Sequence, residues 1–144
     1  MFRNRDRRQP LAVADAHARA VLAAFDDALA RAVPALTPPT GKLRPAARAR
    51  AAAALRTVEE SLATLESHFA EATAHRQDWH RLAERATAEG REDLAAQALH
   101  RTSEAEASAA AYAAEIAAAR ALVRGWSAHV GDPSPPSDLR VDAT

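Results

Sequence analysis

Apolar residues recur at alternating intervals of three and four along two long stretches of this chain, one on each side of Gly90. This heptad spacing gathers side chains into one stripe along a helix, and it is typical of helices that pack lengthwise against each other. The stripe of the first stretch consists of Leu55, Val58, Leu62, Leu65, Phe69, Ala72, Arg76, Trp79, Ala83 and Ala86. The stripe of the second consists of Ala95, Ala98, Thr102, Ala105, Ala109, Tyr112, Ile116, Ala119, Val123, Trp126 and Val130. Two long helices with facing stripes are therefore predicted.

Gly90 separates the two stripes and marks the predicted bend of the chain. Glycine readily adopts the left-handed backbone conformation that often follows a helix end, so the chain is able to fold back there. Folding back pairs large side chains of one stripe mostly with small ones of the other, as close packing requires, and it places Glu59 beside Arg120. The predicted fold is all-α, with a long antiparallel coiled-coil helical hairpin over 46–130.

The residues around the bend form a characteristic string. In order they are Trp79, Ala83, Glu84, Ala86, Gly90, Arg91, Glu92, Asp93, Leu94, Ala95, Ala98 and Leu99. This string resembles the hairpin tip of the phage shock protein A family, which includes the vesicle-inducing protein in plastids and is similar in fold to the membrane-remodelling ESCRT-III subunits. The resemblance extends over 55–130 and is sharpest over 79–99. It implies a non-enzymatic, membrane-associated scaffold of the envelope stress response that self-associates or joins longer family members.

The rest of the chain departs from that family in two respects. The final stretch, GDPSPPSDLRVDAT, does not supply the further helices through which family members form rods and rings, and 1–43 does not closely match the start of the family. The resemblance therefore implies a short form. The alternative hypothesis is a soluble regulatory adaptor whose hairpin binds a longer family member or, by analogy with the family, a AAA+ transcription activator. Under either hypothesis the expected partner-binding residues are those of the tip: Trp79, Glu84, Gly90, Arg91, Glu92, Asp93 and Leu94.

The segment 1–33 combines a basic arm with a predicted amphipathic helix over 11–33. In one interpretation, the arm and the apolar face of the helix contact an anionic membrane surface, where each basic residue contributes about 1 kcal/mol. In the other, the apolar face covers the hairpin and completes a three-helix bundle. The polar face mixes acidic and basic side chains, which favours packing and leaves membrane contact open. The candidates for membrane contact are Arg3, Arg5, Arg7 and Arg8 in the arm, and Leu22, Phe25 and Leu29 on the apolar face.

Prolines divide the chain outside the hairpin. The segment 34–45 contains four prolines and a glycine, which oppose a helix, and it is predicted to be a linker. The segment 131–144 contains three more prolines and is predicted to be a disordered tail. Within the hairpin, helices are predicted over 46–89 and 91–130. Gly125 is a weak point of the second, because glycine in a helix interior costs about 1 kcal/mol relative to alanine.

Length and composition narrow the classes of function. A chain of 144 residues allows one domain, and the absence of cysteine excludes disulfides and thiol chemistry. The 19 basic residues balance 19 acidic ones, which argues against nucleic acid as a partner, since a duplex binder carries a strong basic stripe. No run of 18 apolar residues is present, so no transmembrane helix is predicted. The expected location is cytoplasmic, and peripheral at the inner face of the plasma membrane if the first helix binds lipid.

Neither a catalytic site nor a metal site is predicted. The six histidines are the candidates for metal binding or proton transfer, and no two of them form the i, i+4 pair of helical zinc sites. His80 and His100 approach each other in the folded-back register, but the heptad phase directs His100 outward. The chain has no glycine-rich phosphate loop and no Ser-His-Asp arrangement at an interpretable spacing. We expect no enzymatic activity and no cofactor.

Overall fold

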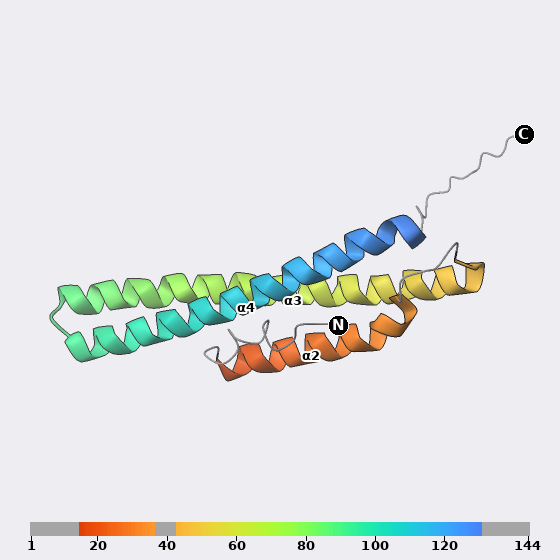
Figure 1. Ribbon diagram of the computed structural model, residues 1–144. Coiled ribbons are helices and arrows are strands. Elements are labelled where there is room, and N and C mark those ends of the chain that lie inside the picture. Colours follow the sequence, from red (N-terminus) through yellow and green to blue (C-terminus); the bar gives the residue numbers. More distant parts are fainter. Residues whose placement is uncertain (1–14, 37–42, 131–144) are drawn as a thin grey trace, which may run out of the picture.

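The computed structural model describes residues 15–36 and 43–130. Within these ranges the chain forms three α-helices and one turn of 3-10 helix: α2 (Ala16–Ala32), η2 (Val33–Leu36), α3 (Pro45–Ala88) and α4 (Glu92–Val130). Helices α3 and α4 lie antiparallel, and α2 lies along them at the end of the hairpin away from the bend (Figure 1). The fold is all-α, a long helical hairpin with an additional N-terminal helix.

The contact between α3 and α4 is made by the predicted heptad stripes. Its buried side chains form one hydrophobic cluster that continues under α2. The stripe positions that are buried in this cluster are Leu55, Val58, Leu62, Leu65, Ala72, Tyr112, Ile116, Ala119 and Trp126. Because these positions alternate by three and four, they lie on one face of each helix. Helix α4 also buries Ser108, Ala111 and Glu115, which lie beside its stripe.

Two contacts between the helices confirm their register. The ring of His68 lies 6.1 Å from the ring of Tyr112, centroid to centroid. Nearer the bend, the guanidinium carbon of Arg101 lies 5.8 Å from the centre of the Trp79 ring. Each pair joins residues at nearly equal distances along the chain from Gly90, as folding back at that glycine requires.

One predicted ion pair is wrong. Arg120 pairs with Glu66 rather than with Glu59. The two glutamates are one heptad apart on the same flank of α3, so the heptad phase alone does not distinguish them. Side chains of a helix lean toward its N-terminus, which for α4 is the direction of the bend. Arg120 therefore reaches the glutamate nearer the bend.

The bend at Gly90 is a glycine-terminated helix end with two closing hydrogen bonds. Gly90 has a φ of 75°, the left-handed conformation expected from the sequence. The backbone N–H of Arg91 donates to the carbonyl of Ala86 at 2.8 Å, and that of Gly90 donates to the carbonyl of Thr87 at 3.0 Å. This pair of bonds is the Schellman pattern, which satisfies carbonyls that the helix end would otherwise leave unpaired. Glu92 and Asp93 then begin α4, where carboxylates are favoured by the helix dipole.

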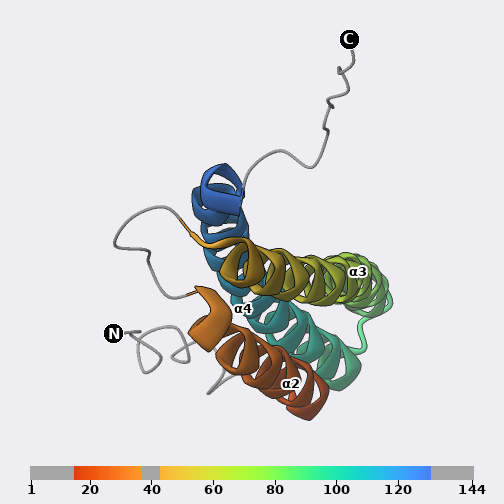
Figure 2. The ribbon, with the colours of Figure 1, turned by 90° about the vertical axis from the view of Figure 1, so that its right-hand side faces the viewer.

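Helix α2 packs on the hairpin through one apolar stripe. It begins at Ala16 rather than at residue 11, because Asp15 caps it: the Asp15 carboxylate accepts a hydrogen bond from the backbone N–H of Ala18 at 2.7 Å. Residues 11–14 lie outside the described part of the chain. The end-on view shows α2 against one side of the hairpin (Figure 2), where it contacts both α3 and α4. Its buried residues are Ala18, Leu22, Phe25, Leu29 and Ala32.

The linker prediction needs one correction. The first residues of 34–45 are not irregular, since η2 includes Pro34 and buries Leu36 in the core. A single 3-10 turn tolerates a proline near its start, where the missing N–H has no intrahelical partner. Pro45 in turn occupies the first position of α3, where proline is favoured. Residues 37–42, the rest of the predicted linker, lie outside the described part of the chain, as does the predicted tail over 131–144.

Candidate functional site

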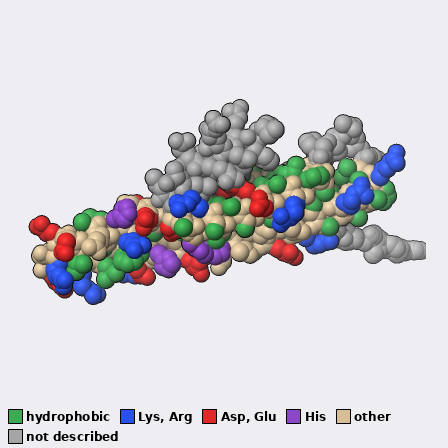
Figure 3. All heavy atoms as spheres, turned by 90° about the horizontal axis from the view of Figure 1, so that it is seen from below, with side chains coloured by type: hydrophobic (Ala, Val, Ile, Leu, Met, Phe, Trp, Pro, Cys, Tyr) green, Lys and Arg blue, Asp and Glu red, His purple; other side chains and the backbone are tan. Residues whose placement is uncertain are grey.

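A hollow in the described surface lies at the tip of the hairpin, between the last turns of α3 and the first turns of α4. It has a volume of about 340 Å³. We call it the tip groove and define it by its lining: Trp79, Leu82, Arg85, Ala86, Glu89, Arg91, Leu94, Gln97, Ala98 and Arg101. In the space-filling view, the tip is at the left, and hydrophobic side chains lie there among acidic and basic ones (Figure 3).

The tip groove exists because alanine fills the helix contact at this end of the hairpin. Ala83, Ala95 and Ala98 are buried between the helices. Small residues let the two backbones approach, but they bury little area, and among the described helices none covers this half of the hairpin besides α3 and α4 (Figure 1). Larger apolar side chains near the bend therefore lie outside the contact and face solvent.

Exposed leucines are concentrated in this region. Among the described residues, the large hydrophobic side chains that are exposed are Leu82, Leu94 and Leu99, at 43%, 36% and 49%. Leu82 and Leu94 line the tip groove, one from each helix, whereas Leu99 lies outside it. Isolated exposed leucines are common on protein surfaces, but two that converge on one hollow are typical of a docking site.

Trp79 closes the end of the tip groove farthest from the bend. Its ring is partly buried, and the Arg101 guanidinium lies over it in a cation–π contact. Such a contact contributes about 0.5–1 kcal/mol where solvent is present, and it holds the arginine at the groove. Arg85 and Arg91 also line the groove, against a single carboxylate, that of Glu89. The lining therefore combines apolar side chains with a net positive charge.

The predicted tip residues divide into two groups. Trp79, Arg91 and Leu94 line the tip groove, and Gly90 makes the bend beside it. Glu84 lies outside the groove within 3.4 Å of the His80 Nε2 atom. Glu92 and Asp93 belong to the first turn of α4 and are absent from the lining. The predicted partner-binding set missed the other seven lining residues, which are Leu82, Arg85, Ala86, Glu89, Gln97, Ala98 and Arg101. Leu82 carried a usable signal, because it is a leucine out of phase with the heptad stripe.

The candidates for membrane contact are placed differently. Leu22, Phe25 and Leu29 are buried between α2 and the hairpin, as the packing interpretation proposed. Arg3, Arg5, Arg7 and Arg8 lie outside the described part of the chain. Contact of these leucines and the phenylalanine with lipid would therefore require α2 to leave the hairpin. Among the residues that the structure describes, no helix has both the length and the apolar character needed to cross a bilayer.

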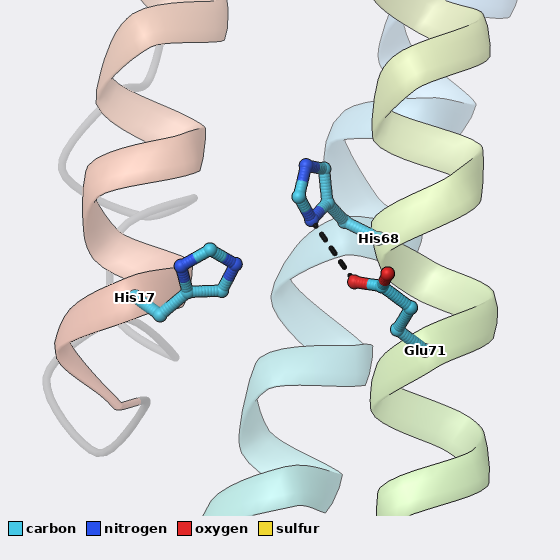
Figure 4. Close-up of side chains that lie close together, drawn as sticks. All are labelled: His17, His68 and Glu71. Carbon is cyan, nitrogen blue, oxygen red and sulfur yellow. Dashed lines mark ion pairs between the residues drawn. The ribbon is translucent and has the colours of Figure 1, made fainter.

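A second group of polar side chains lies where the first turns of α2 meet the hairpin. His17 of α2 and His68 and Glu71 of α3 each direct a potential metal-binding atom to the same place, and these atoms lie within 4.8 Å of one another (Figure 4). The exclusion of a metal site from the sequence was based on histidine spacing within one helix. Across helices it considered His80 and His100 within the hairpin, but not a histidine of the first helix, and the structure brings His17 of α2 beside His68 of α3.

Tyr112 of α4 borders this group and is almost completely buried. Burial raises the pKa of its hydroxyl to about 12, and the nearby carboxylates of Asp15 and Glu71 act in the same direction. Both causes disfavour the phenolate, the first by desolvation and the second by repulsion between like charges. The hydroxyl is consequently neutral at physiological pH and available as a hydrogen-bond donor.

Comparisons of this chain with protein-family models, with curated proteins and with solved structures find no match. The resemblance to the phage shock protein A family thus depends on the residue string at the tip.

Proposed function

We propose that this protein is a non-enzymatic regulatory adaptor that binds a protein partner through the tip groove. The observation that carries this proposal is the convergence of Leu82 and Leu94 from two helices on one hollow that no other described element covers. A groove at the end of a helical hairpin suits the reception of an apolar side chain from a helix of the partner. The fold positions the groove, and the bend at Gly90 connects its two walls.

The charge of the lining specifies the chemistry of the partner. Arg85, Arg91 and Arg101 line the groove with Glu89 as the one acidic residue. The complementary partner is an amphipathic helix with leucine-like side chains at its centre and carboxylates beside them. Complementary charge raises the rate of association and selects the partner, whereas the buried apolar side chains supply most of the affinity. By the resemblance at the tip, the proposed partner is a AAA+ transcription activator or a longer member of the phage shock protein A family.

Titration calorimetry with two purified proteins from the same genome, the AAA+ activator and a longer family member, tests this proposal. We expect Leu94→Ala and Leu82→Ala to weaken binding by about 2 kcal/mol or more each, the range for central apolar contacts of an interface. Leu99→Ala is the matched control, since it removes an equally exposed leucine of α4 that lies outside the groove. Equal affinity for all three variants, or no binding of either protein to the unmodified chain, would refute the proposal.

A second candidate function is a membrane-associated scaffold that self-associates. The amphipathic character of α2 favours it, because Leu22, Phe25 and Leu29 form one continuous apolar face. In this proposal α2 leaves the hairpin and binds an anionic membrane surface, which places the protein at the cytoplasmic face of the plasma membrane. Flotation with vesicles rich in anionic lipid at low salt tests it. Protein that stays at the bottom of the gradient would argue against the scaffold and leave the adaptor unaffected.

A further inference from the structure

His17, His68 and Glu71 have the donor set and the separation of a transition-metal site. His68 and Glu71 are three residues apart on α3, so they share a face of that helix, and His17 projects toward them from α2 (Figure 4). The His68 Nδ1 and Glu71 Oε1 atoms are 3.4 Å apart, and the two histidine rings are 5.3 Å apart between centroids. Two imidazoles and one carboxylate form the three-ligand set found in many zinc sites, with the remaining position left to water.

The distances suit a metal of the size and geometry of zinc. Tetrahedral coordination with bonds of ~2.0–2.1 Å puts neighbouring ligand atoms about 3.3 Å apart. The His68 and Glu71 atoms already have nearly this separation, at 3.4 Å. All three ligand atoms lie within 4.8 Å of one another, so small rotations of the His17 and Glu71 side chains bring the set to coordination distance. Both of these side chains are exposed and therefore able to rotate.

The Nδ1 atom of His68 supplies a second observation. It is shielded from solvent and makes no hydrogen bond within the described part of the chain. Buried polar atoms are almost always paired, since an unpaired one loses its hydrogen bonds to water without replacement. A metal ion bound at this nitrogen would satisfy it, and the carboxylate of Glu71 beside it would balance the positive charge. Carboxylate and imidazole ligands together favour zinc and its neighbours over calcium or magnesium, which take oxygen ligands.

We propose that His17, His68 and Glu71 bind one zinc ion that joins α2 to α3. The site is at the N-terminal end of α2, whereas the other end of that helix continues through η2, whose Leu36 is buried in the core. The ion would therefore join to α3 the end of α2 that is farther from η2. Zinc binding would hold α2 on the hairpin, and zinc removal would make its release easier. This proposal does not depend on the function proposed for the tip groove.

Tyr112 and Asp15 lie near the proposed site but are not proposed as ligands. The ring of Tyr112 lies 6.1 Å from that of His68 and packs beside the proposed ligand. The carboxylate of Asp15 is engaged as the cap of α2, through its bond to the backbone of Ala18. The proposed ligands are thus the two histidines and Glu71, and the role of the ion is to join two helices.

Titration of the metal-free full chain with Zn²⁺, by calorimetry and by competition with a chromophoric chelator, tests the proposal. We expect one ion per chain, and a loss of affinity of roughly tenfold or more in each of His17→Ala, His68→Ala and Glu71→Gln. Co²⁺ serves as a spectroscopic probe, because tetrahedral nitrogen and oxygen coordination gives it visible absorption bands that the His17→Ala variant should lose. His80→Ala is the matched control, since His80 and Glu84 form an exposed two-ligand pair within one helix at the same 3.4 Å separation.

A thermal melt distinguishes a Zn²⁺ site shared by α2 and α3 from Zn²⁺ binding at exposed side chains of one helix. Zn²⁺ should raise the unfolding midpoint of the unmodified chain and of His80→Ala, and it should leave that of His17→Ala unchanged. His17 is exposed, so its replacement should preserve the fold, and circular dichroism without metal checks this. If His17→Ala binds Zn²⁺ with unchanged affinity, or if His80→Ala loses as much affinity as His17→Ala, the proposed site is refuted.

Discussion

The same substitution, glycine to alanine, should have opposite effects at Gly90 and Gly125. Gly90 has a φ of 75° in the bend, a conformation that side chains other than glycine and asparagine rarely adopt. Gly125 lies inside α4, where alanine is the residue with the best helix propensity. At neither position would an added Cβ meet any atom within 4 Å. The local backbone conformation therefore determines both effects, because the added methyl group would not touch another part of the described molecule.

The magnitudes follow from the two conformations. Alanine in the left-handed conformation raises the free energy of the folded state by about 1–2 kcal/mol. Alanine also restricts the unfolded chain more than glycine does, which offsets roughly 0.4–1 kcal/mol of that loss of stability. The Gly90→Ala variant should thus lose about 1 kcal/mol of unfolding free energy. At Gly125 there is no strain to offset, so Gly125→Ala should gain about 0.5–1 kcal/mol. The two variants should differ from each other by roughly 1.5–2 kcal/mol.

Guanidinium unfolding followed by circular dichroism measures both variants against the unmodified chain. A change of 1 kcal/mol corresponds to about 2–4 °C in the unfolding midpoint of a domain of this size, which thermal melts resolve. Gly90→Asn is a further control and should lose less than Gly90→Ala, because asparagine tolerates the left-handed conformation. A neutral or stabilising Gly90→Ala would show that the bend does not have the conformation described here.

Three further predictions concern the core and the helix contacts. Leu22→Ala, which truncates a side chain with 0% exposure between α2 and the hairpin, should lower the unfolding free energy by about 2–5 kcal/mol, measured by denaturant unfolding. The pKa of Tyr112 is raised from 10.0 to about 12 in the folded chain, so its contribution to stability is complete below pH 10 and disappears as the pH rises toward 12. Unfolding measured as a function of pH should show this loss of stability, and the loss should be absent in Tyr112→Phe. A double-mutant cycle should give a coupling of about 0.2–1 kcal/mol between Glu66 and Arg120 and none between Glu59 and Arg120.

The hairpin was predictable because its two stripes and its bend are independent signals that agree. The alternation by three and four fixes which face of each helix is buried, and Gly90 fixes where the chain turns. The partner of Arg120 was not predictable to the same degree. Heptad phase repeats every two turns, so choosing between Glu59 and Glu66 requires the lean of the arginine side chain, which only the folded backbone supplies.

The candidate sites were predictable in part. The tip was located from its residue string, and Trp79, Arg91 and Leu94 do line the groove there. Leu82 was not predicted because the heptad stripe identifies the residues that the helix contact buries. Leu82 lies outside that stripe, and it lines the groove. The proximity of His17 to His68 could not be read from the sequence at all. It depends on how α2 docks, and residues 37–42, which precede α3, carry no signal for that docking.

The shortness of α2 gives the molecule two halves of unequal stiffness. Helix α2 has 17 residues and α3 has 44, so within residues 15–36 and 43–130 the half that includes the bend consists of α3 and α4 alone, with alanine at their contact. Amide protons in that half should exchange with solvent faster than those beneath α2, since fewer apolar contacts oppose local opening. The end that presents its leucines is thus also the end that deforms at the lowest energy. An incoming helix could spread its walls without disturbing the thicker half.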